Sequence, residues 1–387
     1  MTNLIADAVN NIEEIKQGYI TGFFDAEGNI DIKDGYVLSV LINQAHKDVL
    51  ERINAEFKMP SGIQVHSKEG YDKRGVHRKG AWRWRLYSDD AIPFLKYILS
   101  YSIEKRPQVE LAIKYQETMT SHKNSRSGSM FRLSQTEIET REWFKKEIND
   151  LKYVEPNEQT LKNYNNEIKK LSISKDVRDG KQKVLSISEN EIYADINDLY
   201  KQRGIDITEQ QINTQPIPKM SNYIEIGYLT GFYDGEGYVG VSKGKRDSYS
   251  LHVEIANTNF DMLKLYETKF GGKIRLIKKE EEHYKVKYHW DITNNKALSF
   301  LKYIQPFTIV KRQQIDLAIE FQEWHNQIKI IRTPEQKKKA EWYYNTLKDM
   351  KQETGEKISN NDEVESQESQ ESQTSSNVMN KHMNILQ

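Results

Sequence analysis

The clearest pattern in the chain is a strict alternation of apolar and polar residues over positions 248–255. Tyr249, Leu251, Val253 and Ile255 occupy every second position, and mostly polar side chains lie between them. Successive side chains of a β-strand point to opposite faces of a sheet, so this period of two predicts a strand with one buried face. Residues 81–87 show the same alternation and predict a second strand of this kind.

Apolar residues that recur every three or four positions predict amphipathic helices between the strands. The expected helices of the first part of the chain span residues 12–27, 46–57, 89–100 and 104–119. The expected strands of that part span residues 29–33, 36–44, 62–68 and 81–87. The second part follows the same order, with strands expected at residues 238–243, 248–256, 273–279 and 284–292.

The two parts are copies of one unit, because three segments recur in the same order and at nearly the same spacing. Residues 18–28 recur as 227–237, residues 94–98 as 300–304, and residues 105–116 as 311–322. A weaker echo relates residues 132–152 to residues 332–351. We therefore predict an α+β fold of two pseudo-symmetric αββαββα units. Each unit has an antiparallel, saddle-shaped sheet, and the units pack together through their first helices.

This repeat divides the chain into four parts. The first unit with its appended helices is expected at residues 1–152, and the second unit with its appended helix at residues 223–351. Residues 153–222 have no counterpart after the second unit, and their Lys- and Asn-rich stretches predict a helical insertion or linker. Residues 352–387 form a Ser-, Gln- and Glu-rich tail without the apolar residues needed for folding, so a disordered acidic tail is expected there.

Composition excludes several classes of protein. The chain has no cysteine, which rules out disulfides and cysteine-ligated zinc. It shows neither a signal-peptide pattern nor a run of about 18–20 apolar residues, so we expect a soluble intracellular protein of a bacterial cytoplasm or an organelle, without a membrane partner. The formal net charge is zero, but the acidic tail conceals a mildly basic remainder.

Glycine spacing in the repeated helix predicts a close helix–helix contact. Gly18, Gly22 and Ala26 lie four residues apart on one helix face, and Gly227, Gly231 and Gly235 do the same in the second copy. A glycine inside a helix costs about 1 kcal/mol relative to alanine, so a stripe of small residues needs a reason. Close backbone approach supplies it, and we expect the two helices to pack against each other about a pseudo-two-fold axis, which makes the protein a monomer.

Two glutamates close this repeated helix, and they are the strongest candidates for chemistry. Glu27 and Glu236 each precede a glycine, Gly28 and Gly237, which we expect to end the helix in a left-handed conformation. Packing about a two-fold axis would bring the two carboxylates together at helix C-termini, where negative charge is disfavoured. A divalent cation with oxygen ligands would relieve that repulsion, so we predict a site for Mg²⁺ or Mn²⁺ held by Glu27 and Glu236.

The duplicated segment resembles the motif of the LAGLIDADG homing endonucleases. The resemblance rests on Ile20-Thr-Gly-Phe-Phe-Asp-Ala-Glu-Gly28 and Leu229-Thr-Gly-Phe-Tyr-Asp-Gly-Glu-Gly237, and it covers about residues 18–120 and 227–325. In that family the last acid of the motif binds the catalytic metal, which assigns this role to Glu27 and Glu236. Asp25 and Asp234 match the other acidic position of the motif, and we expect them to be structural.

Four further residues match catalytic positions of the family. Gln44 and Asn257 end corresponding strands, where a polar residue would orient the attacking water or simply cap the next helix. Lys105 and Lys311 precede the last repeated helix, where a lysine would stabilise charge on the phosphate or polarise a water. The resemblance thus implies the catalytic set Glu27, Glu236, Gln44, Asn257, Lys105 and Lys311.

The same resemblance implies that one face of each sheet reads DNA, because a two-stranded ribbon fits the major groove. Strand parity decides which residues face outward, since core positions fix the orientation of their neighbours. In the first unit the expected base-contacting residues are Ser39, Asn43, Arg83, Arg85 and Tyr87. In the second unit they are Ser248, Ser250, His252, Glu254, Lys287, His289 and Asp291. The two sets differ, so the target is not expected to be a strict palindrome.

These features predict a sequence-specific endonuclease that makes a staggered break in a long double-stranded DNA target, as in intron homing. Two alternatives stay open. One is an RNA maturase with host intron RNA as a partner, and the other is a DNA-binding regulator that keeps the fold without cutting. Loss of the acids at the ends of the motifs would indicate the regulator, and both acids are present.

Overall fold

A computed structural model describes most of the two predicted units. The described residues are 11–57, 62–71, 77–78, 80–123, 135–152, 218–245, 248–277, 287–328 and 333–353. The insertion predicted at 153–222 and the tail predicted at 352–387 lie almost entirely outside them. None of the helices in the described ranges combines the length and the apolar character that a membrane span requires.

The first unit follows the predicted order of elements. Helix α2 (Ile12–Glu27) leads to strands β1 (Gly28–Lys33) and β2 (Val37–Gln44), then to helix α3 (Lys47–Phe57). Strands β3 (Ile63–Ser67) and β6 (Ala81–Tyr87) follow, and between them lies a small hairpin, β4 (Gly70–Tyr71) and β5 (His77–Arg78), that the sequence pattern did not predict. The unit closes with η1 (Ser88–Asp90), α4 (Ala91–Leu99), α5 (Arg106–Lys123) and α6 (Gln135–Asp150).

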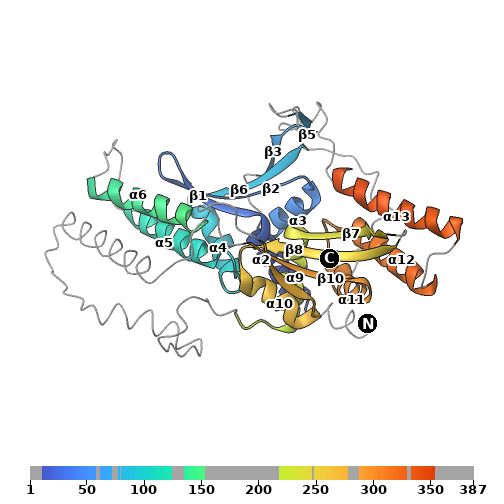
Figure 1. Cartoon of the computed structure of the whole chain (residues 1–387). Coiled ribbons are helices and arrows are strands. Elements are labelled where there is room, and N and C mark those ends of the chain that lie inside the picture. The colour runs from blue at the N-terminus through green and yellow to red at the C-terminus, as the bar shows by residue number, and fades with distance from the viewer. Residues whose placement is uncertain are drawn as a thin grey trace.

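The second unit repeats this order. Helix α9 (Asn222–Glu236) is followed by β7 (Gly237–Lys243), β8 (Tyr249–Asn257), α10 (Phe260–Phe270), β9 (Lys273–Ile277) and β10 (Lys287–Thr293). It ends with α11 (Asn294–Ile304), η3 (Gln305–Phe307), α12 (Arg312–Ile328) and α13 (Pro334–Glu353). The pairs α5–α6 and α12–α13 extend at opposite ends of the molecule (Figure 1).

Each unit contains one antiparallel four-stranded sheet. The strand order is β1-β2-β6-β3 in the first sheet and β7-β8-β10-β9 in the second. In the first sheet Ile42 pairs with Trp84, and in the second sheet its counterpart Ile255 pairs with Trp290. Corresponding strands therefore occupy corresponding places, and the predicted α+β fold of two repeated units is confirmed.

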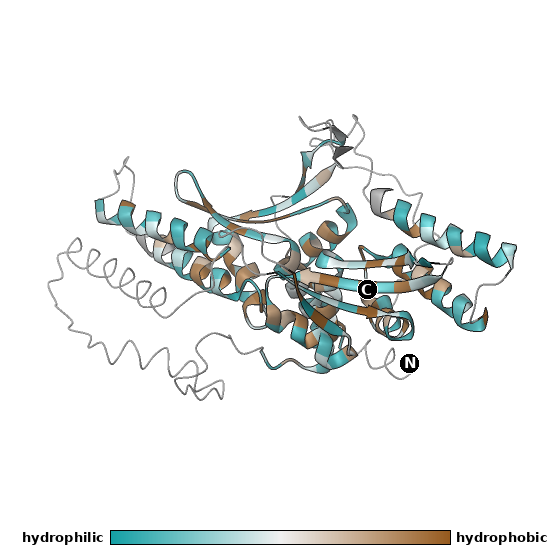
Figure 2. Ribbon diagram, viewed as in Figure 1, coloured by the Kyte–Doolittle hydropathy of each residue, from teal (hydrophilic) through white to brown (hydrophobic). Residues whose placement is uncertain are grey.

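The burial of alternate residues confirms the predicted strand parity. Trp82, Trp84 and Leu86 of β6 are buried, while the arginines between them are half-buried on the other face of the sheet. Residues of β8 alternate from Tyr249 to Asn257 between buried and half-buried. Apolar and polar residues also alternate along the strands in Figure 2. One face of each sheet is thus covered by helices, and the other presents polar side chains.

Each unit has its own aromatic core against the covered face of its sheet. In the first unit the rings of Phe24 and Trp84 both pack edge-on against Phe94 of α4. In the second unit Tyr233 and Trp290 pack in the same way against Phe300 of α11. The motif aromatics point into their own units, as predicted, so the helix face between them is left for contact with the other unit.

The glycines after the two motif helices do not adopt the left-handed conformation that we predicted. Gly28 has φ −71° and ψ 153°, and Gly237 has φ −72° and ψ 155°, which is extended backbone. Both glycines are the first residues of the next strand, and space rather than handedness requires them. A Cβ atom at Gly28 would lie 2.4 Å from the ring of Phe24, and one at Gly237 would lie 2.2 Å from the ring of Tyr233.

Candidate active site

The two motif helices, α2 and α9, pack with their backbones in contact. A Cβ atom at Gly22 would lie 2.1 Å from the carbonyl oxygen of Tyr228, and one at Gly231 would lie 2.1 Å from that of Tyr19. A Cβ atom at Gly18 or at Gly227 would lie at the same distance from a carbonyl oxygen of the opposite helix. This confirms the predicted seam. Because the helices run to corresponding residues, the seam places Glu27 and Glu236 at the same end of the pair.

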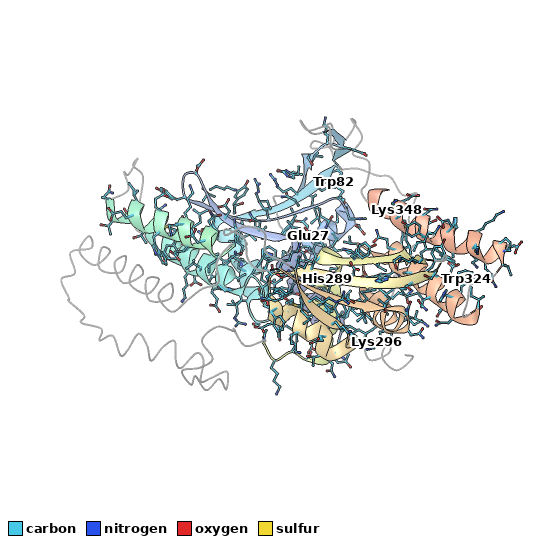
Figure 3. The ribbon with its side chains drawn as sticks, in the orientation of Figure 1. Glu27, Trp82, His289, Lys296, Trp324 and Lys348 are labelled. Atoms are coloured by element: carbon cyan, nitrogen blue, oxygen red, sulfur yellow. The ribbon has the colours of Figure 1, made fainter. Side chains whose placement is uncertain are left out.

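The electrostatics around the two carboxylates disfavour their ionised forms. Burial raises the pKa of Glu27, and the nearby charge of Glu236 raises it further. Neighbouring protein atoms exclude part of the surrounding water from Glu236 and raise its pKa as well, although its side chain reaches the surface. Glu27 lies near the middle of the molecule (Figure 3). Two acids are therefore held close together where negative charge is costly without a cation.

Lys105 and Lys311 stand beside this pair, each at the start of the last repeated helix. The ammonium of Lys105 donates to the carbonyl oxygen of Asp25, and that of Lys311 donates to the carbonyl oxygen of Asp234. Burial lowers the pKa of Lys311, while the charges of Asp234, Glu27 and Glu236 oppose that shift. The lysines thus bind the carbonyl ends of the motif helices, and their positive charge lies within reach of both glutamates.

Asp25 holds the segment that carries Lys105. Its carboxylate accepts hydrogen bonds from the hydroxyl of Ser102 at 2.6 Å and from the backbone N–H groups of Ile103, Glu104 and Lys105. It also accepts one from the hydroxyl of Tyr228, which belongs to the other motif helix, at 2.6 Å. Asp25 is fully buried. It is structural, as predicted, and it fixes Lys105 relative to the helix seam.

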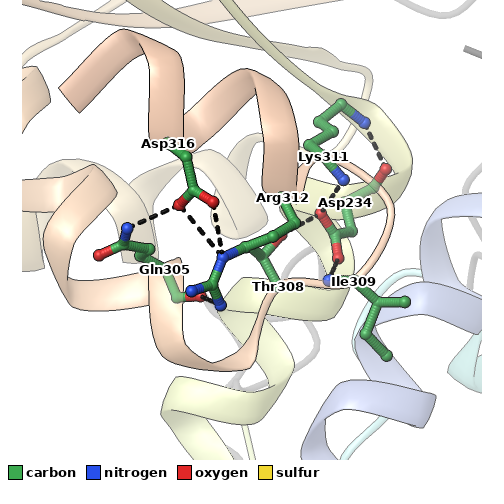
Figure 4. Close-up of polar contacts among 7 residues, drawn as sticks. All are labelled: Asp234, Gln305, Thr308, Ile309, Lys311, Arg312 and Asp316. Atoms are coloured by element: carbon green, nitrogen blue, oxygen red, sulfur yellow. Dashed lines mark hydrogen bonds and ion pairs between the residues drawn. The ribbon is translucent and has the colours of Figure 1, made fainter. Parts of the chain in front are cut away.

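Asp234 repeats this arrangement in the second unit. It accepts hydrogen bonds from the hydroxyl of Thr308 and from the backbone N–H groups of Ile309 and Lys311 (Figure 4). It also accepts from the hydroxyl of Tyr19 and from the backbone N–H group of Val310. Ile309 packs against the core of the first unit, and its counterpart Ile103 packs in the core of the second. Each lysine-bearing segment therefore crosses to the opposite unit, so the lysine of one copy stands beside the acid of the other.

Gln44 and Asn257 do not occupy equivalent surroundings. Gln44 lines a small pocket together with Glu27 and Lys311. The side chain of Asn257 is buried, donates to the carboxylate of Glu104 at 2.9 Å, and accepts from the backbone of Asn259 at 2.7 Å. The helix that follows Asn257 is capped by Asn259, so the alternative of Asn257 as the helix cap is wrong. Asn257 is already engaged on both sides of its amide.

The pair of glutamates fits a divalent cation as a two-carboxylate site. The described part of the chain contains no group of three or more His, Cys, Asp or Glu residues that could hold a metal ion. Mg²⁺ is commonly bound by one or two carboxylates, with waters and substrate phosphate oxygens as the other ligands. Two acids with raised pKa values at adjacent helix ends match that pattern, because cation binding would favour their ionised forms.

The polar face of the first sheet is basic. Arg83 donates from Nε to Asn43 at 2.7 Å, and its Nη2 atom lies 3.1 Å from Nε2 of His66. Arg85 donates to the hydroxyl of Tyr87 at 2.7 Å. All five predicted residues therefore belong to this face, and four of them reach its surface. Ser39 is a correction, because its side chain is fully buried. It pairs with the larger Asp31 and Tyr87, and so short a side chain does not reach past them.

The corresponding face of the second sheet is mixed in charge. Ser250, His252 and Glu254 of β8 are half-buried on this face, and Ser248 is exposed just before the strand. Nε2 of His289 lies 3.4 Å from the carboxylate of Glu254, and Arg275 forms an ion pair with Asp291 at 3.2 Å. Lys287 is exposed at the start of β10. All seven predicted residues belong to this face or its edge.

Sequence reasoning missed Glu104, the half-buried partner of Asn257. Burial raises the pKa of Glu104 to about 7, with Asp25 and Glu236 adding to the shift and Lys105 opposing it. The repeat itself held the signal, because Glu104 aligns with an apolar residue, Val310, immediately before the aligned lysines. His66 and Arg275 were also missed, since their partners lie on neighbouring strands.

Comparisons with known proteins show the same architecture. No protein-family model and no curated protein sequence matches the chain. Solved structures do match: I-SmaMI bound to uncleaved DNA target in the presence of calcium ions has a TM-score of 0.52 and 16% identity, and covers 86% of this chain and 98% of its own.

Two further structures agree with the first. The LAGLIDADG homing endonuclease I-GzeII in complex with DNA target has a TM-score of 0.50 and 16% identity, and covers 89% of this chain and 99% of its own. I-LtrWI, a LAGLIDADG homing endonuclease bound to target DNA, has a TM-score of 0.52 and 13% identity, and covers 87% and 98%. With two motif helices packed through glycines and one four-stranded sheet on each, this chain has the fold of the single-chain LAGLIDADG homing endonucleases.

Proposed function

We propose that this protein is a sequence-specific DNA endonuclease that makes a staggered break in a long, non-palindromic duplex by Mg²⁺-dependent phosphodiester hydrolysis. The observation that carries the proposal is the pair Glu27 and Glu236, held at one end of the packed helices with Lys105 and Lys311 beside them. Proteins of this fold that bind DNA targets support it.

Glu27 and Glu236 would hold the cation, Mg²⁺ or Mn²⁺. A bound divalent cation lowers the pKa of a coordinated water and neutralises charge on the phosphate. The fold itself positions the two carboxylates and the two lysines. The glycine seam fixes the two carboxylates relative to each other, and the hydrogen bonds of Asp25 and Asp234 fix the two lysines relative to the seam.

Lys105 and Lys311 supply positive charge where the phosphate oxygens gain negative charge. Preorganised charge of this kind acts strongly in a site from which water is partly excluded, because the groups need no reorganisation during the reaction. Lys311 is suited to this role because its ammonium is anchored on the carbonyl oxygens of Asp234 and Gly235. The negative charges of Asp234, Glu27 and Glu236 favour its charged form and oppose the lowering of its pKa by burial. Gln44 faces the same pocket and is placed to orient a water near Glu27.

The two sheets provide the sequence recognition. Arginine donates two hydrogen bonds to guanine, and carboxylates accept from cytosine, so the basic first face and the mixed second face favour different bases. Arg83 and Arg85 on one sheet and Glu254 and Asp291 on the other are the main candidates. Unequal faces on two copies of one unit predict a target whose half-sites differ.

The test is a cleavage assay on a pool of random-sequence DNA, sequenced after incubation with the full-length protein and Mg²⁺. We expect cut ends that define one long site, with both strands broken a few bases apart. The same reaction with EDTA should give no cut ends.

A matched control uses a glutamate at the opposite end of the same helix. Glu13 is exposed in the first turn of α2, so Glu13→Gln should cut as the parent does. Binding of a preferred duplex without any cleavage at all would overturn the endonuclease and favour a DNA-binding regulator. Binding of structured RNA with no preference among duplexes would favour a maturase.

A further inference from the structure

The crossing of the lysine-bearing segments divides the active site into two halves of mixed origin. The Glu27 half contains Glu27 and Gln44 of the first unit with Val310 and Lys311 of the second, which together line one pocket. The Glu236 half contains Glu236 and Asn257 of the second unit with Glu104 and Lys105 of the first. Each half would serve one DNA strand, because a double-strand break needs two scissile phosphates.

The two halves share a backbone but differ in one side chain. The backbone N–H of Glu104 donates to Asp25 at 3.1 Å, and that of Val310 donates to Asp234 at 3.1 Å. Both residues immediately precede the lysine of their copy. The main chain is therefore held alike in both halves of the active site. The two halves differ because Glu104 carries a carboxylate and Val310 carries an apolar group.

This carboxylate changes its surroundings in two ways. It accepts a hydrogen bond from the amide nitrogen of Asn257. Gln44, whose amide oxygen accepts from the backbone N–H of Ala45 as that of Asn257 does from Asn259, lines the pocket of the other half with Val310 in the place of Glu104. The carboxylate of Glu104 also adds negative charge near Glu236 and Lys105. Val310 does neither. A phosphate in the Glu236 half would thus meet an additional negative charge and a lysine whose charge is partly compensated.

We propose that Glu104 makes the two halves unequal, so that the strand served by the Glu236 half is cut more slowly and singly nicked DNA accumulates. The inference rests on the proposed endonuclease function. Glu104 acts here as a positioning residue, through Asn257 and through its effect on the charge near Glu236 and Lys105. The near-neutral pKa of Glu104 is consistent with this, because the carboxylate is largely ionised at mildly alkaline pH.

The experiment follows the two strands of the selected target separately, with a different label on each, at a pH well above the pKa of Glu104. The parent should cut one strand more slowly, by a factor on the order of 10. Glu104→Val and Glu104→Gln should each accelerate that strand and leave the other unchanged. Exchange of the two residues, Glu104→Val with Val310→Glu, should reverse the order of cutting.

Glu117→Gln is the matched control, because Glu117 is an exposed acid on α5 that pairs only with Lys96 among the described ion pairs. It should leave both rates unchanged. Equal changes on both strands in the Glu104 variants would show a structural role and overturn the inference, as would a strand ratio that stays at the parent value. Glu104→Gln keeps the test decisive if the exchange variant does not fold. A parent that cuts no DNA would instead overturn the proposed function itself.

Discussion

The motif-helix seam and the polar faces of the two sheets are repeated in both units, yet they differ in how closely the copies agree. At the seam a Cβ atom at either Gly22 or Gly231 would lie the same 2.1 Å from a carbonyl oxygen of the opposite helix, and Asp25 and Asp234 accept equivalent hydrogen bonds. On the sheets, β6 carries arginines where β10 carries His289 and Asp291. Both copies of the seam must satisfy the same geometry, whereas under the proposed function each sheet face has only to fit its own half of a DNA target.

The seam should be the part of the molecule least tolerant of change. Gly22→Leu or Gly231→Leu places a side chain against a backbone carbonyl that has no room to move, so we expect a loss of about 3 kcal/mol or more of unfolding free energy. Chemical denaturation monitored by tryptophan fluorescence measures it. Gly70→Ala is the control, because a Cβ atom there meets nothing within 4 Å. A stable Gly22→Leu variant would show that the helices are not in backbone contact.

The two aspartates come next in expected effect. Asp234→Asn removes charge from a buried carboxylate that accepts from three backbone N–H groups and two hydroxyls, and we expect a cost of about 2–4 kcal/mol. Thermal unfolding measures this cost. Asp316 is an exposed aspartate on α12, the helix that begins immediately after Lys311, and it is also drawn in Figure 4. Asp316→Asn should cost less than about 0.5 kcal/mol. Similar losses in both variants would contradict the anchoring role of Asp234.

Changes on the sheet faces should alter base preference and leave stability nearly untouched. Arg83→Ala should relax the preference at a few base pairs of one half-site, at about 1–3 kcal/mol for each lost bidentate contact. Glu254→Gln should do so in the other half-site. Site-selection profiles measure both effects, with Lys96→Ala on the helix side of the first unit as the control. Profiles of Arg83→Ala that match the parent at every position would remove this face from DNA recognition.

The smallest expected effect is electrostatic. The folded protein raises the pKa of Glu27, so the folded state holds this proton more tightly than the unfolded state does. Without a divalent cation, the stability contributed by that proton is present below the ordinary carboxyl pKa and is lost as the pH rises through the raised value. Glu27→Gln avoids this loss.

Thermal unfolding in EDTA at neutral pH should therefore show the Glu27→Gln variant about 1–3 °C above the parent. Added Ca²⁺ should raise the melting temperature of the parent and leave that of the variant nearly unchanged, since binding to the folded state alone stabilises it. A parent that is more stable than the variant in EDTA would reverse the sign of the proposed repulsion between Glu27 and Glu236.

Most of the fold could be predicted from two features of the sequence, the repeated segments and the alternation of apolar and polar residues. The small-residue stripe of Gly18, Gly22 and Gly231 predicted the helix contact because only a backbone approach explains several glycines on one helix face. Parity placed Arg83 and Arg85 correctly because Trp82 and Trp84 define the buried face. These are local patterns, and the period of a strand or helix is enough to read them.

Features that depend on neighbouring side chains, in the same copy or in the other, could not be read in this way. The buried state of Ser39 depends on the size of its cross-strand neighbours, and the lack of room for a Cβ atom at Gly28 and Gly237 depends on the rings of Phe24 and Tyr233. Asn257 could be aligned with Gln44, but its partner Glu104 lies 153 residues away in the opposite unit. In the sequence, the contact was indicated only by the difference between Glu104 and Val310 at equivalent positions of the repeat.

The central claim is that Glu27 and Glu236 act together in chemistry and contribute little to holding DNA. The direct measurement compares Glu27→Gln and Glu236→Gln with the parent on the selected target, with cleavage followed in Mg²⁺ and binding followed in Ca²⁺. The account predicts that each variant loses double-strand cleavage while its DNA affinity stays within a few-fold of the parent. Full double-strand cleavage by either variant would contradict it.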